Sequence, residues 1–307
     1  MSISMPPYVM QACTMLQEHG FQAYLVGGAI RDSLLGIKPL DWDITTNATP
    51  DQTAQLFSHA LPTGKQFGTL TVILAGQGLE ITTMRDDGPY SDRRHPDYIT
   101  FTNELQLDLA RRDFTINSIA YDPFNNEIID PFKGRRHLRR KLLATVGAAE
   151  KRFTEDPLRM LRLVRFQSTL GFRIEKKTRK TLPELARLVN NVSSERILAE
   201  LNKMLLGKEL LLSLETFYTS GLMAEILPEL VEGHGISPGS SHPYDLLGHA
   251  MVAANFAYPT LPLRWAALLH DIGKQETLRR EHAEISAIRA QKLLERLRAP
   301  NELVSKV

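Results

Sequence analysis

The sequence predicts an α+β protein with a sheet-containing N-terminal domain, a helical middle and a helical C-terminal segment. Short β-rich runs alternate with short helical runs up to about residue 145. After Val146, apolar residues recur at helical spacing almost throughout. Residues 233–243, "GHGISPGSSHP", are rich in Gly, Ser and Pro and indicate a linker. We therefore expect domains over residues 1–145, 146–235 and 236–307.

The elements of the first domain follow from local spacing and from turn residues. Thr49 is suited to cap a helix that carries Pro50 in its first turn. Residues 86–97, "DDGPYSDRRHPD", are polar and interrupted by Gly and Pro, so we expect a mobile loop. In chain order we expect a strand over 21–28, a helix over 29–36, a strand over 40–46, a helix over 49–60, and paired strands over 68–74 and 79–85.

The helical part is clearest in two segments. Residues 154–171 predict an amphipathic helix that begins at Thr154 and ends at Gly171. A second helix is expected between a Ser194 cap and Gly207. The chain ends at Val307 without a helix stop signal, so we expect a truncated third segment. The apolar face of the first helix comprises Leu158, Leu161, Leu163, Val164 and Phe166.

The composition is that of an ordinary globular protein. Of 307 residues, 43% are hydrophobic, so the chain can bury a substantial core. Cys13 is the only cysteine and cannot form an internal disulfide, and no signal peptide or membrane span is visible, which favours the cytoplasm and no membrane partner. The net charge is +2, but basic residues dominate between Lys133 and Lys180. They could form solvated helix faces or bind nucleic acid.

Two carboxylates stand out in "PLDWDITTNATP". In an extended strand Asp41 and Asp43 point to one side and Trp42 to the other. Such a pair fits Mg²⁺, which takes one or two protein carboxylates and completes its coordination with water and phosphates. An exposed strand face is the alternative. The preceding Gly27 and Gly28 lie between a strand and a helix, where backbone N–H groups can approach a phosphate.

These motifs resemble those of the class II tRNA nucleotidyltransferases, the CCA-adding enzymes, and their bacterial poly(A) polymerase relatives in the polymerase-β nucleotidyltransferase superfamily. "LVGGAIRDSLLGIKPLDWDIT" matches the first motif, including Arg31. "DLARRDFTINSIAYD" resembles the ribose and triphosphate motif, "EDPLRMLRLVRF" the nucleotide-selecting motif, and "ERILAELNKML" the motif that follows it. The resemblance implies a polymerase-β-like head followed by a helical neck and body.

The resemblance also implies roles for individual residues. Asp41 and Asp43 would hold two Mg²⁺ ions while the 3′-hydroxyl of tRNA attacks the α-phosphate of CTP or ATP. Arg111 and Arg112 would contact the triphosphate. Asp113 and Asn117 would lie nearer the ribose, although Asp113 could also simply cap a helix.

The segment "EDPLR" predicts nucleotide selection. We expect Asp156 and Arg159 to project from the same side of a helix, where a surface ion pair is the alternative. Cytosine and adenine both present an amino donor beside a ring-nitrogen acceptor, so a carboxylate beside a guanidinium would match C and A and reject U and G. By resemblance, Arg162 and Arg165 join this nucleotide-binding set.

Two further features follow from the resemblance. The loop resembles the flexible loop that family members use to add the terminal A, and the basic helices after residue 133 would face the acceptor arm of tRNA. No DNA partner is expected. The matching loop residues are Arg85, Asp87, Tyr90, Asp92 and Arg94.

The histidines near the C-terminus form a separate motif. His270 and Asp271 are adjacent on an apolar helix, with His249 upstream, which resembles the H…HD…D motif of HD phosphohydrolases. Imidazole and carboxylate ligands suit a transition metal. The next candidate ligand, His282, is only eleven residues beyond Asp271, and the distal aspartate has no counterpart. A degenerate HD segment with buried polar groups is therefore the stronger expectation.

Five functions remain open from the sequence. Template-independent addition of C, C and A to tRNA is the leading hypothesis. An A-adding enzyme or a poly(A) polymerase would share the first-domain motifs. An HD-type phosphohydrolase on an RNA-binding scaffold is the alternative from another class, and a non-enzymatic RNA-binding protein is disfavoured by the intact carboxylates.

Overall fold

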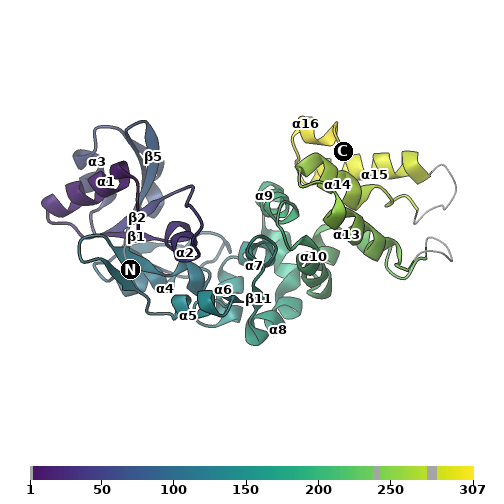
Figure 1. Ribbon diagram of the computed structural model, residues 1–307, viewed down its shortest axis with the longest axis horizontal. Helices are drawn as coiled ribbons and strands as arrows, with labels where there is room; N and C mark the ends of the chain where they lie inside the picture. Colours follow the sequence, from purple (N-terminus) through teal and green to yellow (C-terminus); the bar gives the residue numbers. More distant parts are fainter. Residues whose placement is uncertain (1–2, 238–242, 275–281) are drawn as a thin grey trace. The chain divides into compact units, whose positions relative to one another are not determined.

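The computed structural model describes residues 3–237, 243–274 and 282–307 (Figure 1). Part of the expected linker over 233–243 lies outside these residues. The chain divides into two compact units, residues 1–148 and 149–307. Sheet and helices occur together in the first unit, and helices dominate the second, which confirms the predicted α+β class. Among the described helices, none combines the length and the apolar character needed to cross a membrane.

The first unit is built on a mixed seven-stranded sheet with the order β3-β4-β5-β2-β1-β8-β9. The central pair β2 and β5 is parallel, and the other neighbours are antiparallel. A separate hairpin joins β6 and β7. The strands of this unit are β1 (Ala23–Val26), β2 (Asp43–Thr46), β3 (Ala60–Gly64), β4 (Thr69–Leu74), β5 (Gln77–Thr83), β6 (Arg85–Asp87), β7 (Ile99–Phe101), β8 (Ala120–Asp122), β9 (Glu127–Ile129) and β10 (Leu142–Leu143).

The helices of the first unit are short. Thr49 and Gln52 form a reciprocal capping box at the start of α3, which confirms the predicted cap. That helix was expected to reach residue 60 but ends at Leu56, where Phe57 turns to an extended conformation. Strand β3, which the sequence did not predict, begins at Ala60. The first helix, α1, was also not predicted. The helices are α1 (Pro7–Glu18), α2 (Gly28–Leu34), α3 (Pro50–Leu56), η1 (Lys65–Phe67), α4 (Leu105–Ala110), η2 (Thr115–Asn117) and α5 (Gly134–Arg139).

The second unit contains the remaining helices and the short strand β11 (Arg173–Ile174). The helices are α6 (Ala149–Glu155), α7 (Leu158–Leu170), α8 (Lys176–Leu185), η3 (Ala186–Asn191), α9 (Ser194–Leu205), α10 (Leu210–Thr219), α11 (Leu222–Ile226), α12 (Pro228–Val231), α13 (Leu246–Phe256), α14 (Leu261–Leu269), α15 (His282–Arg296) and α16 (Asn301–Val304).

Helix α7 packs against α9 and α10. All five predicted apolar positions of this helix are buried, and it ends at Gly171 in the left-handed conformation, as expected. Helix α9 ends at Leu205 with Leu206 as its cap, directly before the predicted terminator Gly207. A Cβ atom at Gly207 would lie 2.0 Å from the Ser168 hydroxyl, so glycine there allows the end of α9 to pack against α7.

Candidate functional site

The carboxylate pair lies at the start of strand β2. The strand begins at Asp43 and not at Leu40, so Asp41 and Trp42 precede it. The expected alternation is retained, because Asp41 is exposed, Trp42 is buried and Asp43 is half-buried. Asp43 pairs in register with Val26 of β1 on one side and Glu80 of β5 on the other.

The surroundings of Asp43 disfavour its negative charge. Burial, the neighbouring Glu80 and, to a lesser degree, Asp41 raise the pKa of Asp43 to about 6, while Arg112 opposes the shift. Three carboxylates therefore gather at this point of the sheet. Sequence reasoning missed Glu80, because the parallel pairing of β2 with β5 brings together residues far apart in the chain. Hard carboxylate oxygens that repel one another fit a divalent cation such as Mg²⁺.

Gly27 allows the backbone to pass close to these charges. Its φ of 75° lies in the left-handed region, and an added Cβ atom would be 3.3 Å from both Asp43 Oδ2 and Arg112 Nη1. Both the conformation and the space therefore favour glycine. Gly28 is the first residue of α2, so the turn between β1 and α2 lies where the sequence predicted it.

Asp108 organises the arginines beside this site. It is fully buried in α4 and accepts hydrogen bonds from Arg111 Nη2 at 2.7 Å, Arg112 Nη2 at 3.3 Å and the Thr45 hydroxyl of β2 at 3.2 Å. Burial alone would raise the pKa of Asp108, but the two guanidinium groups outweigh it and lower that pKa. The spacing Asp108, Arg111, Arg112 is i, i+3, i+4, a signal that the sequence did contain.

Arg112 keeps one donor available. Its Nε atom is buried and has no hydrogen-bond partner among the described residues. The same side chain lies against Gly27 and lowers the pKa of Asp43. A buried guanidinium N–H near a carboxylate cluster is suited to an anionic ligand such as a phosphate.

A polar chain connects α2 to the segment "RRDFTIN". Arg31 Nη1 donates to Asn117 Oδ1 at 2.8 Å, and Asn117 Nδ2 donates to Asp113 Oδ1 at 3.0 Å. Asp113 also accepts from the Phe114 N–H at 2.7 Å. The alternative interpretation made Asp113 the helix cap. The capping residue of η2 is instead Phe114, so Asp113 lies one position before the cap. Its carboxylate instead orders the turn and Asn117.

The predicted loop is held at its base by the β6–β7 hairpin. Asp87 accepts from Arg85 Nε at 2.8 Å and from the Tyr90 hydroxyl at 2.6 Å, and its Oδ2 lies 3.9 Å from Arg111 Nη1. This part of the loop is thus connected to the arginines on Asp108.

The outer part of the loop is more exposed. Asp92 accepts from the backbone N–H groups of Arg94 and His95 and from the His95 ring. These hydrogen bonds lower the pKa of Asp92 to about 2. The expected mobility of the loop stays a prediction.

In the second unit the helix expected over 154–171 is broken. Helix α6 ends at Glu155 and α7 begins at Leu158, with Asp156 and Pro157 between them. A residue before proline is disfavoured in helical conformation, so Pro157 accounts for the break. The expectation that Asp156 and Arg159 project from one side of one helix was therefore wrong.

Each member of that pair has another partner. Asp156 Oδ2 accepts from Arg196 Nη2 of α9 at 2.9 Å. Arg159 Nη1 donates to Glu155 Oε2 at 2.9 Å. The ion pair that the alternative reading placed between Asp156 and Arg159 is not what holds either side chain. Both side chains remain on the same short segment at the start of α7.

Glu200 supports the remaining arginines of α7. This carboxylate is 5% exposed and accepts from Arg165 Nε at 2.9 Å, with Arg162 Nη1 at 3.7 Å. The Arg165 guanidinium also lies 3.6 Å from the centre of the Phe166 ring, a cation–π contact. Arg196 and Glu200 are one turn apart on α9. Arg196 contacts Asp156, and Glu200 contacts the arginines of α7. Sequence reasoning did not identify either residue.

The basic segment forms an exposed face on α8. Thr178 is buried, whereas the four basic residues around it are exposed. They are available for contact with an anionic partner such as a nucleic-acid backbone. These residues are Lys176, Lys177, Arg179 and Lys180.

The C-terminal histidines come together around one carboxylate. Ligand atoms of His249, His270 and Asp271 lie within 4.8 Å of one another. Asp271 is 5% exposed. Its Oδ2 lies 3.1 Å from His270 Nε2 and 2.8 Å from Lys274 Nζ. Its Oδ1 lies 3.8 Å from His282 Nε2. Helix α14 ends at Leu269, His270 caps it in helical conformation, and Asp271 follows directly. His270 is exposed, so the expectation that it is a buried polar group was wrong. The imidazole and carboxylate groups of this cluster fit a transition metal.

Comparison with known proteins places these features in a family. Residues 23–144 match the poly A polymerase head domain, and residues 171–233 match a probable RNA and SrmB-binding site of polymerase A. The chain is 41% identical over 265 residues to a CCA-adding enzyme of Geobacillus stearothermophilus, covering 85% of this chain and 62% of that protein. It is 45% identical over 202 residues to a CCA-adding enzyme of Leuconostoc mesenteroides, covering 66% of this chain and 50% of that protein.

A solved structure extends this similarity. The crystal structure of the Bacillus stearothermophilus CCA-adding enzyme in complex with CTP superimposes with a TM-score of 0.79 at 33% identity, covering 98% of this chain and 68% of that one. A Thermotoga maritima CCA-adding enzyme complexed with tRNA shares the fold, with a TM-score of 0.65 at 23% identity, covering 100% of this chain and 79% of that one. The chain spans 62% or less of the length of these curated relatives.

Proposed function

Because the chain belongs to the class II CCA-adding enzyme family with a poly A polymerase head domain, we propose that it adds C, C and A to the 3′ end of tRNA from CTP and ATP without a template. The cluster of Asp41, Asp43 and Glu80 beside Arg112 carries this proposal, because it combines cation ligands with a buried donor for phosphate. Relatives of known structure were solved with CTP and with tRNA. We place the activity in the cytoplasm.

The residues of the first unit would divide the chemistry among themselves. Asp41 and Asp43, with Glu80 adjacent, would hold two Mg²⁺ ions, which activate the attacking 3′-hydroxyl and stabilise the charge on the leaving pyrophosphate. The fit rests on the raised pKa of Asp43, since a carboxyl group that is costly to ionise alone is stabilised by a cation. Arg112 would donate its Nε hydrogen to the triphosphate, and Arg111 would accompany it from the same Asp108 anchor. The turn at Gly27 and Gly28 keeps side chains away from the phosphates.

A polar chain would position the ribose. Arg31 orients the Asn117 amide through its oxygen, and Asn117 in turn contacts the Asp113 carboxylate. Asp113 and Asn117 are each less than 10% exposed, so their orientations are fixed before a nucleotide arrives. Fixed acceptors and donors of this kind suit the ribose hydroxyls.

Nucleotide selection would use Asp156 and Arg159. Asp156 accepts from an exocyclic amino group and Arg159 donates to a ring nitrogen, which matches cytosine and adenine. Asp156 is held through both oxygens, by Arg196 Nη2 and by the Leu158 N–H, and Arg159 Nη1 donates to Glu155 and to the Arg152 carbonyl. Both side chains are therefore oriented before a base arrives. Arg162 and Arg165, held on Glu200, would complete the nucleotide contacts. The loop around Asp87, Tyr90 and Arg94 would act in adding the terminal A, and the exposed basic face of α8 would contact the acceptor arm of tRNA.

One gel experiment tests the proposed reaction. Labelled CTP or ATP is incubated with three tRNAs that end before CCA, after CC or after CCA. We expect C, C and A to be added in turn to the first, A alone to the second and nothing to the third. Addition of A only would indicate an A-adding enzyme, and long A tracts a poly(A) polymerase. Asp43→Asn should bind tRNA but lose incorporation, while the exposed Asp51→Asn keeps it. Near-normal incorporation by Asp43→Asn would exclude the metal role.

Selectivity is tested separately. Asp156→Ala and Arg159→Ala should reduce the preference for CTP and ATP over UTP and GTP by at least about tenfold, since each removes a discriminating hydrogen bond to the base. The measured quantity is kcat/KM for all four nucleotides on the tRNA that ends before CCA. Glu184→Ala, on the exposed side of α8, is the matched control. If both variants keep the wild-type preference, these residues have only a structural role.

A second function is favoured by the histidine cluster. We propose a transition-metal site at His249, His270 and Asp271, with His282 as a fourth candidate ligand, that could support phosphohydrolase activity. Metal analysis of the purified protein and hydrolysis of a 2′,3′-cyclic nucleotide test the two parts. His249→Ala should remove the metal, whereas the exposed His59→Ala should not. Protein without bound metal and without hydrolysis would leave the cluster a structural role.

A further inference from the structure

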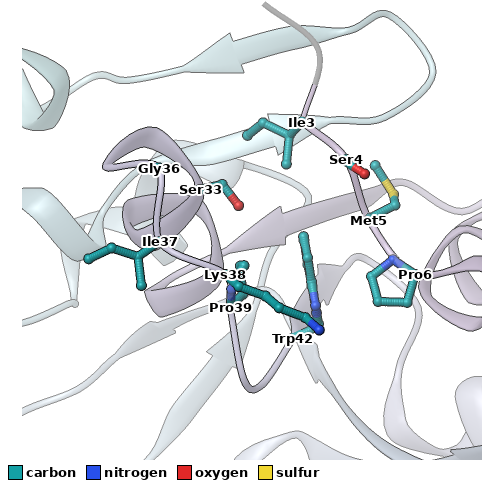
Figure 2. A pocket seen from close by; sticks show the side chains of 10 residues that line it. All are labelled: Ile3, Ser4, Met5, Pro6, Ser33, Gly36, Ile37, Lys38, Pro39 and Trp42. Carbon is teal, nitrogen blue, oxygen red and sulfur yellow. The ribbon is translucent and has the colours of Figure 1, made fainter.

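A hollow of about 560 Å³ lies behind the segment that carries the catalytic carboxylates. It is bounded by the N-terminal segment, by the end of α2 and by the loop that leads to β2 (Figure 2). Its volume lies within the range of roughly 300–1,000 Å³ that is typical of small-molecule sites. None of the proposed steps of nucleotide addition uses this hollow. Its apolar walls include Ile3, Met5, Pro6, Ile37 and Pro39.

Two polar groups that line the hollow have no hydrogen-bond or ion-pair partner among the described residues. The Ser33 hydroxyl oxygen is buried and makes no hydrogen bond with any described residue. Figure 2 shows this oxygen directed into the space between α2 and the N-terminal segment. A buried hydroxyl without a hydrogen bond costs free energy, so a ligand that bonds to it would be favoured. Lys38 is exposed and forms no ion pair with the described part of the chain, so its ammonium group can receive an anion.

The remaining wall is aromatic. Trp42 is 5% exposed and lines the hollow with its indole ring, and Figure 2 shows the Lys38 side chain running toward that ring. Trp42 alternates with Asp41 and Asp43 along the extended chain, so its ring lies on the side opposite to the carboxylates. The flat ring, together with the two proline rings, favours a planar ligand over a branched one.

From these observations we propose that the hollow binds a small planar aromatic anion. The ring of the ligand packs against Trp42 and the prolines, its acidic group lies at Lys38, and the Ser33 hydroxyl donates to it. The site differs in position and residues from the proposed nucleotide site. Its existence therefore does not depend on the proposed function.

Tryptophan NMR offers a direct test, because the protein has only two tryptophans. With ¹⁵N-labelled tryptophan, each indole N–H gives one cross-peak, and Trp265→Phe assigns them. The probe is naphthalene-1-carboxylate, and the neutral naphthalene-1-carboxamide is its matched analogue. The Trp42 peak should shift in a saturable manner, while the peak of the fully buried Trp265 in the other unit stays in place.

Variants separate the charge from the apolar contact. Lys38→Met should weaken the carboxylate by about fivefold, or about 1 kcal/mol, and should leave the carboxamide nearly unchanged. Lys208→Met, an exposed lysine in the second unit, gives the same change of net charge as a control. Ser33→Leu should fill the hollow and abolish binding of both probes. If that variant does not fold, the lysine pair still decides. A Trp42 peak that does not move at about 5 mM probe would mean an affinity weaker than millimolar and would overturn the proposal. Equal effects of the two lysine variants would also overturn it.

Discussion

Asp108→Asn provides the sharpest test of how the charges beside strand β2 are arranged. The side chain is fully buried and accepts from Arg111, Arg112 and Thr45. Asparagine keeps the shape, removes the charge and turns one acceptor into an N–H₂ donor that faces guanidinium donors. Loss of one partner of a buried ion pair costs about 3–5 kcal/mol. We expect a loss of that size in the free energy of unfolding of the first unit.

The unit can be followed by itself in urea. In a Trp265→Phe background, Trp42 fluorescence reports only on the first unit, because Trp42 is then the only tryptophan. With an m-value of about 2 kcal/mol/M, the midpoint should fall by roughly 1.5–2.5 M urea. The exposed Asp86→Asn should change stability by less than about 0.5 kcal/mol. A loss below 1 kcal/mol for Asp108→Asn would refute the role of Asp108 as the anchor of both arginines.

The pH dependence of this difference has a definite sign. The arginines hold the folded-state pKa of Asp108 below its usual value, despite burial. Its stabilising contribution is therefore present above the unfolded pKa of about 3.9 and is lost as the pH falls through the lower folded pKa. The stability gap between wild type and Asp108→Asn should be constant from pH 7 to 5 and should shrink at more acid pH. A gap that stays constant down to acid unfolding would contradict this reasoning.

Three further predictions concern the carboxylate cluster. Gly27→Ala should reduce single-turnover incorporation by about tenfold or more, because its Cβ meets Asp43 and Arg112. Gly20→Ala, which has a similar φ and open space around it, should not reduce incorporation. Equal effects of the two variants would indicate backbone strain alone. Glu80→Gln should raise the Mg²⁺ concentration needed for half-maximal incorporation, and an unchanged Mg²⁺ titration would remove Glu80 from the cation site. In EDTA, stability should fall by about 2.5 kcal/mol between pH 4 and 7 relative to Asp43→Asn. The reason is that the raised folded pKa, about 6 against 3.8, gives Asp43 a stabilising contribution only at low pH. Parallel pH curves for the two proteins would refute that shift.

Local signals predicted much of this molecule. The strand, glycine turn and helix around Gly27 follow from adjacent residues, and so do the Thr49 cap and the buried face of α7. Each of these depends on interactions within a few positions of the chain. The break at Pro157 was also visible in the sequence, but the helical periodicity on both sides of it hid its effect. The position of Asp156 was predicted wrongly for that reason.

The contacts that could not be predicted share a physical origin. A buried charge requires a counter-charge, and spacing along one helix suggests only counter-charges three or four residues away. That suggestion succeeds for Asp108, where both arginines are on the next turn, and fails for Asp156, whose partner Arg196 lies 40 residues further along the chain. Glu80 beside Asp43 has the same character, because a parallel strand register joins them. Motifs thus suggest which residues form the site, whereas the pKa and the orientation of each group depend on neighbours that only the fold supplies.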